Sequence, residues 1–203
     1  MALQAEIIAV TPFRQNCTLL WDDETREAVL TDVGGDVPYL LQELDAKNLT
    51  LTAIWLTHGH LDHAGGVVEL REHRPVPVIG PHADDDFLLQ ALPETTAQYG
   101  FPVSPAFEPT RWLTEGETLK VGSHAFQVLH IPGHTPGHVV FYCAEAGLLI
   151  AGDVLFYETI GRTDFPRGNH ADLIHNIRNK LFVLPEDTRV IAGHGRMTDI
   201  GHE

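Results

Sequence analysis

Short runs of apolar and β-branched residues, separated by polar or glycine-rich turns, recur along the chain and predict strands. In the N-terminal half, the predicted strands are residues 6–10, 17–21, 27–31, 51–57 and 76–80. In the C-terminal half, they are residues 126–131, 138–143, 148–151 and 189–192.

Helical periodicity marks further segments between and after these strands. The first helix follows Asp36, a residue suited to capping its start, and its apolar face consists of Leu40, Leu41 and Leu44. A second helix is suggested by Val67, Val68 and Leu70. Residues 81–99 read as a polar helix or an irregular stretch, followed by a proline-rich loop to Trp112. The last helix covers residues 169–182, with Asn169 as its cap.

Strands at both ends of the chain, with helices between and after them, predict an α+β fold or a layered αββα arrangement. The 203 residues are enough for one sizeable core, so we expect a single domain over residues 1–203. Hydrophobic residues make up 43% and charged residues 20%, which is typical of an ordinary globular protein.

The formal net charge of −15 argues against nucleic acid and anionic membrane surfaces as partners, because both require a basic face. No apolar run is long enough to span a membrane, and the N-terminus does not resemble a signal peptide, so we expect a cytoplasmic protein. Cys17 and Cys143 lie in apolar surroundings and are expected to act as small buried hydrophobes, although a single bridge between them stays open.

Histidines carry the first chemical signal. The chain has 13 of them, as many as lysines and arginines together, and four metal-competent side chains fall between His58 and His63. They are His58, His60, Asp62 and His63. The cluster follows an apolar strand, and a strand end leading into a loop can turn successive side chains towards one point. Imidazole and carboxylate suit zinc, iron or manganese; the alternative is a solvated loop.

Three more strand ends each deliver a candidate ligand directly after a glycine. They are Gly133-His134, Gly152-Asp153 and Gly193-His194. Glycine lets the backbone turn tightly where a site needs room. Four strand ends that present ligands in this way predict a common metal site.

The motifs HxHxDH, PGHTPGH, AGD and AGHG resemble those of the metallo-β-lactamase superfamily. More narrowly, residues 152–156, 161–168 and 193–201 resemble the glyoxalase II branch, the hydroxyacylglutathione hydrolases. The resemblance implies a four-layer αββα sandwich and two divalent metal ions, with zinc as the first expectation and iron or manganese as alternatives. It places the first ion on His58, His60 and His134, and the second on Asp62, His63 and His194, with Asp153 bridging them. We expect a short form of the branch, without its C-terminal helical domain.

The resemblance also implies a reaction: hydrolysis of a thioester by a metal-bridging hydroxide, with S-lactoylglutathione as the leading substrate. Asp62 could in addition orient the hydroxide. Arg162 stands where the branch places a basic residue near the glycyl carboxylate of glutathione, and Arg167 lies close by, so we expect both to bind substrate; surface charge is an equally good interpretation of the two. His138 is expected to lie outside the ligand set, in a supporting or packing role. The partner would be a small acyl thioester, and the sequence predicts no oligomeric state.

Three other functions stay open. A mononuclear iron persulfide dioxygenase of the same superfamily would use His58, His134 and Asp153. A lactonase or β-lactamase would use the same two metals, although neither cysteine is placed as a ligand. A non-catalytic metal-binding module is the third alternative.

Overall fold

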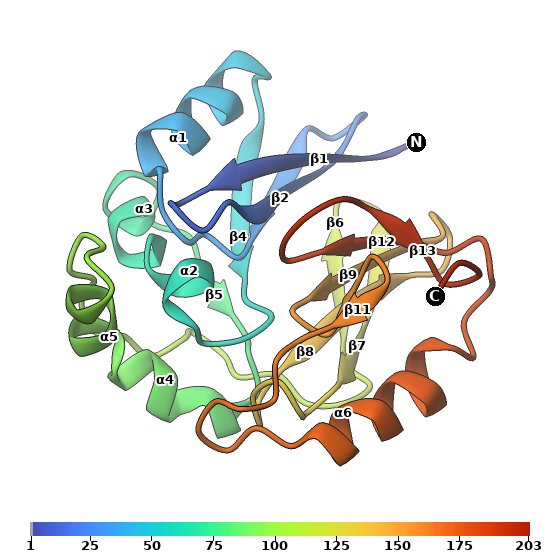
Figure 1. Ribbon diagram of the computed structural model, residues 1–203. Helices are drawn as coiled ribbons and strands as arrows, with labels where there is room; N and C mark the ends of the chain where they lie inside the picture. Colours follow the sequence, from blue (N-terminus) through green and yellow to red (C-terminus); the bar gives the residue numbers. More distant parts are fainter. Residues whose placement is uncertain (1) are drawn as a thin grey trace.

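The computed structural model describes residues 2–203, and two mixed β-sheets form its centre (Figure 1). The first sheet has the order β1-β2-β3-β4-β5. Its strands are β1 (Leu3–Val10), β2 (Gln15–Asp22), β3 (Glu27–Thr31), β4 (Thr50–Trp55) and β5 (Val78–Ile79). The second has the order β13-β12-β9-β8-β7-β6. Its strands are β6 (Thr118–Val121), β7 (His124–His130), β8 (Val139–Cys143), β9 (Leu148–Gly152), β12 (Arg189–Ala192) and β13 (Thr198–Asp199).

Alternate residues of the central strands enter different cores, and this arrangement produces the layers. In β2, Leu19 packs towards the helices of the first half, whereas Leu20 packs between the sheets. In β8, Phe141 faces the space between the sheets and Val140 the opposite side. Because successive side chains of a strand point to opposite faces, a strand that is apolar throughout must be covered on both sides.

Helices cover both outer faces, as Figure 1 shows. On the first sheet lie α1 (Val37–Ala46), α2 (Leu61–Ala64), α3 (Val67–His73), α4 (Asp86–Gln90) and α5 (Leu92–Gln98), with the short 3₁₀ turn η1 (Ala83–Asp85) before α4. On the second sheet lies α6 (His170–Asn176), continued by one π-helical turn, η2 (Ile177–Leu181). The expected four-layer αββα sandwich is therefore confirmed.

Of the two N-cap residues predicted from the sequence, one caps its helix with its side chain and the other does not. Asn169 caps α6 as predicted, because its Oδ1 accepts a hydrogen bond from the backbone N–H of Asp172 at 3.1 Å. Asp36 stands at the start of α1 but does not cap it with its side chain. Its backbone is left-handed, with φ of 51°, and its carboxylate instead accepts the N–H of Thr11 at 2.7 Å.

Several short elements were not predicted. They are α2, β6, β13 and the two-stranded ribbon of β10 (Leu155–Phe156) and β11 (Thr159–Ile160). Elements of two to four residues carry too few positions for a period to be recognised.

The two cysteines lie in separate cores, Cys17 beneath the helices and Cys143 between the sheets. Both are buried and free, so the bridge that the sequence left open is absent. Among residues 2–203, no helix is long and apolar enough to cross a membrane.

Candidate metal centre

The seven predicted ligands come together at one rim of the two sheets. His58 and His60 lie in the loop after β4, and Asp62 and His63 lie on α2. The remaining three follow β7, β9 and β12: His134, Asp153 and His194. The expectation of a plain loop after β4 was wrong from Leu61 onward, because one helical turn carries Asp62 and His63.

The first cluster consists of His58, His60 and His134. Nδ1 of His60 lies 3.1 Å from Nε2 of His58 and 3.1 Å from Nε2 of His134. Two nitrogens bound to one tetrahedral zinc ion at 2.0–2.1 Å are about 3.3 Å apart. The spacing of these nitrogens therefore fits a shared ion.

The second cluster consists of Asp62, His63 and His194. Oδ2 of Asp62 lies 3.0 Å from Nε2 of His194 and 3.5 Å from Nε2 of His63. Asp153 lies between the clusters: its Oδ1 is 3.3 Å from His63 Nε2, and its Oδ2 is 3.5 Å from His134 Nε2. One carboxylate thus reaches both groups.

A buried carboxylate outside the clusters, Asp32, sets the protonation of two imidazoles. Its Oδ2 lies 3.0 Å from Nδ1 of His63, so that nitrogen must carry the proton. The same oxygen accepts the hydroxyl of Thr57 at 2.7 Å. Because the Thr57 hydroxyl donates there, it can only accept from Nδ1 of His58, 3.0 Å away. In the neutral form, both histidines therefore present a bare Nε2 to the centre.

Backbone carbonyls do the same for two more imidazoles. Nδ1 of His134 lies 2.7 Å from the carbonyl oxygen of Arg162, and Nδ1 of His194 lies 3.2 Å from that of Phe13. A carbonyl only accepts, so each Nδ1 donates and each Nε2 is left with a free lone pair. In the neutral rings, these four lone pairs and the two carboxylates form a donor set suited to cations.

The electrostatics of the centre support the same conclusion. Burial lowers the pKa of His58 well below its ordinary value and that of His60 to about 3, so both are neutral. Burial would raise the pKa of Asp153, but neighbouring histidines, His63 first, bring it far below its usual range. Burial would also lower the pKa of His63, yet three carboxylates, Asp153 first, raise it well above 6.5. Neutral imidazole and ionised carboxylate are the forms that bind metals. His58, His60 and Asp153 already have the binding form, whereas His63 would release a proton when an ion binds.

Among the predicted ligands, two buried atoms have no hydrogen-bond partner: Nε2 of His63 and Oδ1 of Asp153. A buried polar atom without a partner is costly, and a divalent ion between these two would satisfy both. The donor set thus fits two divalent metal ions.

A second buried carboxylate, Asp85, ties the ligand-bearing loops together. Its Oδ2 accepts the N–H of Gly59 at 3.0 Å and the hydroxyl of Thr135 at 2.8 Å, and its Oδ1 accepts the N–H of Gly137 at 2.6 Å. One loop carries His58 and the other His134. Burial raises the pKa of Asp85 to about 6 despite these bonds.

Sequence reasoning missed both Asp32 and Asp85. A signal existed for Asp32, since it directly follows a predicted strand, as the ligands do. Nothing distinguishes Asp85 from the aspartates on either side of it.

His138 lies outside both clusters. Its Nε2 accepts the backbone N–H of Asp153 at 3.1 Å, and its ring stacks on that of His58 at 4.6 Å. This arrangement agrees with the supporting role predicted for it.

Close packing explains why the residue before His194 is a glycine. A Cβ on Gly193 would collide with Oδ1 of Asp153 and approach Cε1 of His63 to 2.9 Å. Only a residue without a side chain leaves the carboxylate its place between the clusters.

Aromatic side chains frame the mouth of the centre. The Phe165 ring meets the ring of His60 at 4.8 Å and the ring of His134 at 5.7 Å. Beside His194 lies the exposed Phe13, whose ring contacts those of Tyr99 and Phe101 at 6.0 Å and 4.9 Å. The metal-facing atoms therefore open between two apolar walls.

The two predicted substrate-binding arginines are both exposed, and the backbone of Arg162 adjoins the centre through its carbonyl bond to His134. Arg162 stacks on Phe165 at 4.2 Å and forms two 2.8 Å hydrogen bonds to Asp164. Those bonds use two of the five guanidinium donors, so three stay available. Arg167 stacks on Phe87 at 4.2 Å.

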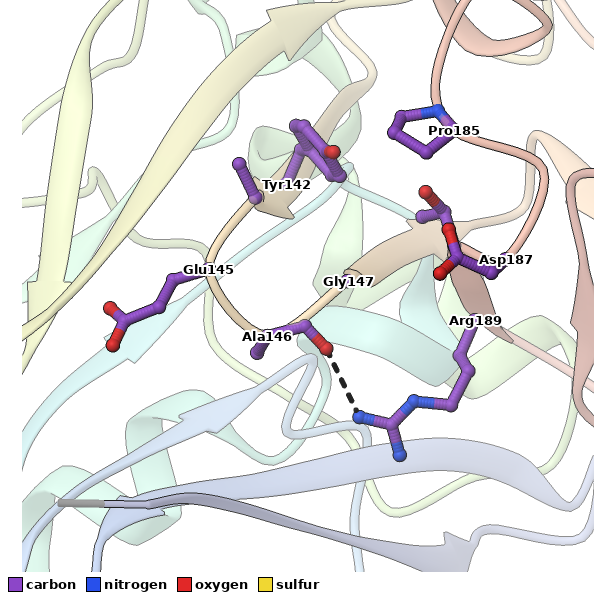
Figure 2. Close-up of a pocket in the computed structure, with 9 residues that line it drawn as sticks. Tyr142, Glu145, Ala146, Gly147, Pro185, Asp187 and Arg189 are labelled. Carbon is purple, nitrogen blue, oxygen red and sulfur yellow. Dashed lines mark hydrogen bonds between the residues drawn. The ribbon is translucent and has the colours of Figure 1, made fainter.

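A separate cavity of about 370 Å³ lies at the β8–β9 turn (Figure 2). Arg189 donates a 3.3 Å hydrogen bond to the carbonyl of Ala146 there. None of the predicted ligands lines this cavity, so it is not part of the metal centre.

Comparison with known proteins agrees with the fold. The profile of the metallo-β-lactamase superfamily matches residues 10–194. The chain belongs to this superfamily. It is 48% identical over 202 residues to hydroxyacylglutathione hydrolase GloC of Haemophilus influenzae, covering 99% of this chain and 95% of that protein. It is a metal-dependent hydrolase of the glyoxalase II-like group.

Two solved structures are also similar. The crystal structure of the BLEG-1 B3 metallo-β-lactamase has a TM-score of 0.89 and 38% identity, covering 99% of this chain and 95% of that one. The structure of TTHA1623 in a di-iron-bound form has a TM-score of 0.88 and 36% identity, covering 97% of this chain and 96% of that one.

Proposed function

We propose that this chain hydrolyses a thioester, with S-lactoylglutathione as substrate and lactate and glutathione as products. The observation that carries the proposal is the pair of clusters joined by Asp153. The similarity to hydroxyacylglutathione hydrolase GloC supports the glutathione thioester as substrate class.

The roles of the residues follow from their positions. His58, His60 and His134 would hold one ion, Asp62, His63 and His194 the other, with Asp153 between them. Two bound divalent ions would polarise the thioester carbonyl and lower the pKa of an attacking water. Zinc is the first candidate, and the di-iron form of TTHA1623 supports iron as the alternative.

Asp62 is assigned a second role. Its carboxylate contacts His194 and borders His63, between the ligands of the second ion, and can orient the attacking water. No protein acid is needed for the leaving group, because a thiol with a pKa of about 8.5 departs readily as the thiolate. Arg162, whose backbone adjoins His134, and Arg167 would bind the substrate carboxylates, since both side chains are exposed.

The test combines metal analysis of the purified protein with thiol release from S-lactoylglutathione. About two metals per chain and rapid thiol release are expected. Asp62→Asn should lose most of the activity, and Asp45→Asn, which removes an exposed charge elsewhere, should retain it. An Asp62→Asn protein with full activity and full metal content would refute the role of Asp62.

Other outcomes would favour other functions. One iron per chain, with oxygen uptake on glutathione persulfide and no thiol release, would indicate the dioxygenase. The similarity to BLEG-1 makes β-lactam hydrolysis the second candidate, and lactam and lactone substrates tested alongside would reveal it. A metal-loaded protein inert towards all of these would indicate a binding module.

A further inference from the structure

A third group of metal-competent side chains lies apart from the centre. It consists of His82, Asp84 and His130, one ligand atom of each lying within 4.8 Å of the others. His82 directly precedes η1, and His130 ends β7. We propose that these three side chains bind an additional divalent transition-metal ion. The inference does not depend on the proposed hydrolase activity.

One donor separation in the group matches the centre, whereas its two imidazole rings are stacked and not edge to face. Nδ1 of His82 lies 3.3 Å from Oδ2 of Asp84, the same separation as between His63 Nε2 and Asp153 Oδ1. The rings of His82 and His130 stack at 4.3 Å with an angle of 13°. Two imidazoles and one carboxylate form a donor set that suits zinc, iron or nickel.

His130 is held in place as a metal-binding histidine usually is. Its Nε2 lies 2.9 Å from the carbonyl oxygen of Pro136, which fixes the orientation of the ring. Nδ1 of His82 accepts a 3.2 Å hydrogen bond from the N–H of Asp84, which caps η1, and lies close to the Asp84 carboxylate. A metal ion on Nδ1 would take the place of that bond.

The surroundings permit a positive ion. The nearby cation, Lys180, is paired with Glu115 at 3.0 Å. The side chain of His82 is 23% exposed and that of Asp84 is 58% exposed, so water can complete the coordination. The net charge of −15 adds a general attraction for cations.

An ion here would also brace the catalytic loops. The backbone N–H of His82 donates to the carbonyl of Gly137, and its carbonyl accepts the N–H of Asp85. Asp85 in turn joins the loops that carry His58 and His134. Binding at the additional site should therefore raise the melting temperature of the holoprotein, because a ligand stabilises the state it binds.

The test is equilibrium dialysis of protein already holding two zinc ions against increasing free Zn²⁺, followed by metal analysis. Wild type should take up a third equivalent. His82→Ala and Asp84→Asn should weaken that equivalent about tenfold or more, while keeping the first two. His73→Ala, which removes an exposed histidine outside the group, should bind like wild type.

Two results would overturn the inference: wild type that saturates at two ions, or a third equivalent unaffected by Asp84→Asn. Should His82→Ala fail to fold, Asp84→Asn still decides, because its side chain is mostly exposed. An inactive protein that takes up the third ion would contradict only the proposed function. An active protein that does not would contradict only this inference.

Discussion

Asp32 offers the sharpest test of how the metal centre is built. Asp32→Asn keeps the size of the side chain but can replace Oδ2 with a donor nitrogen opposite Nδ1 of His63. Two donors would then face each other. His63 can avoid this contact only by moving its proton to Nε2, the nitrogen with which it would bind the second ion.

The magnitude follows from the bond that is lost. A buried hydrogen bond to a charged group contributes about 1.5–3 kcal/mol. Since about 1.4 kcal/mol corresponds to a factor of ten, the affinity for the second ion should fall about 10–100-fold. The first cluster should change much less, because His58 can still donate to Thr57, which stays in place.

Competition with a chromophoric chelator measures both affinities. Asp45→Asn is the matched control, since it removes the same charge from an exposed position paired with Arg74. Unchanged affinity for both ions would refute the role given to Asp32. Equal weakening of both would show that Asp32 acts on the first ion, through Thr57 and His58, as strongly as on the second through His63.

Three further predictions concern other parts of the centre. Gly193→Ala should displace the Asp153 carboxylate and weaken metal binding about 10–100-fold in the same chelator assay; retention of both ions at wild-type affinity would contradict the close packing. In metal-free protein, the contribution of Asp85 to stability is full below pH 3.8 and is lost as the pH rises through its folded pKa of about 6. Urea unfolding should therefore show that the free energy of unfolding of wild type falls by roughly 3 kcal/mol, relative to that of Asp85→Asn, between pH 3.8 and pH 6. A difference that stays constant over this range would contradict the prediction. Phe13→Ala keeps the backbone carbonyl that holds His194 but removes an apolar ring beside the centre. We expect KM for the thioester to rise about fivefold with kcat little changed. The control Tyr39→Ala removes an exposed aromatic ring on α1 and should alter neither constant.

The sequence by itself determined much of the architecture and the ligand set. Runs that are apolar on both faces predict covered sheets, and the glycine-flanked histidines and aspartates stand at strand ends. The resemblance to the superfamily, carried by those motifs, implied the four layers that the structure has. That all 203 residues form one domain, and that the protein is cytoplasmic, stay predictions.

Tertiary structure alone decided what orients the ligands. His63 depends on Asp32, 31 positions away, and His194 depends on the carbonyl of Phe13, 181 positions away. Asp85 binds partners 26 to 52 positions distant. No local pattern encodes such contacts, because they form only when separate loops dock on the same rim. The left-handed backbone of Asp36 has the same origin, since its carboxylate is drawn away from α1 by the N–H of Thr11.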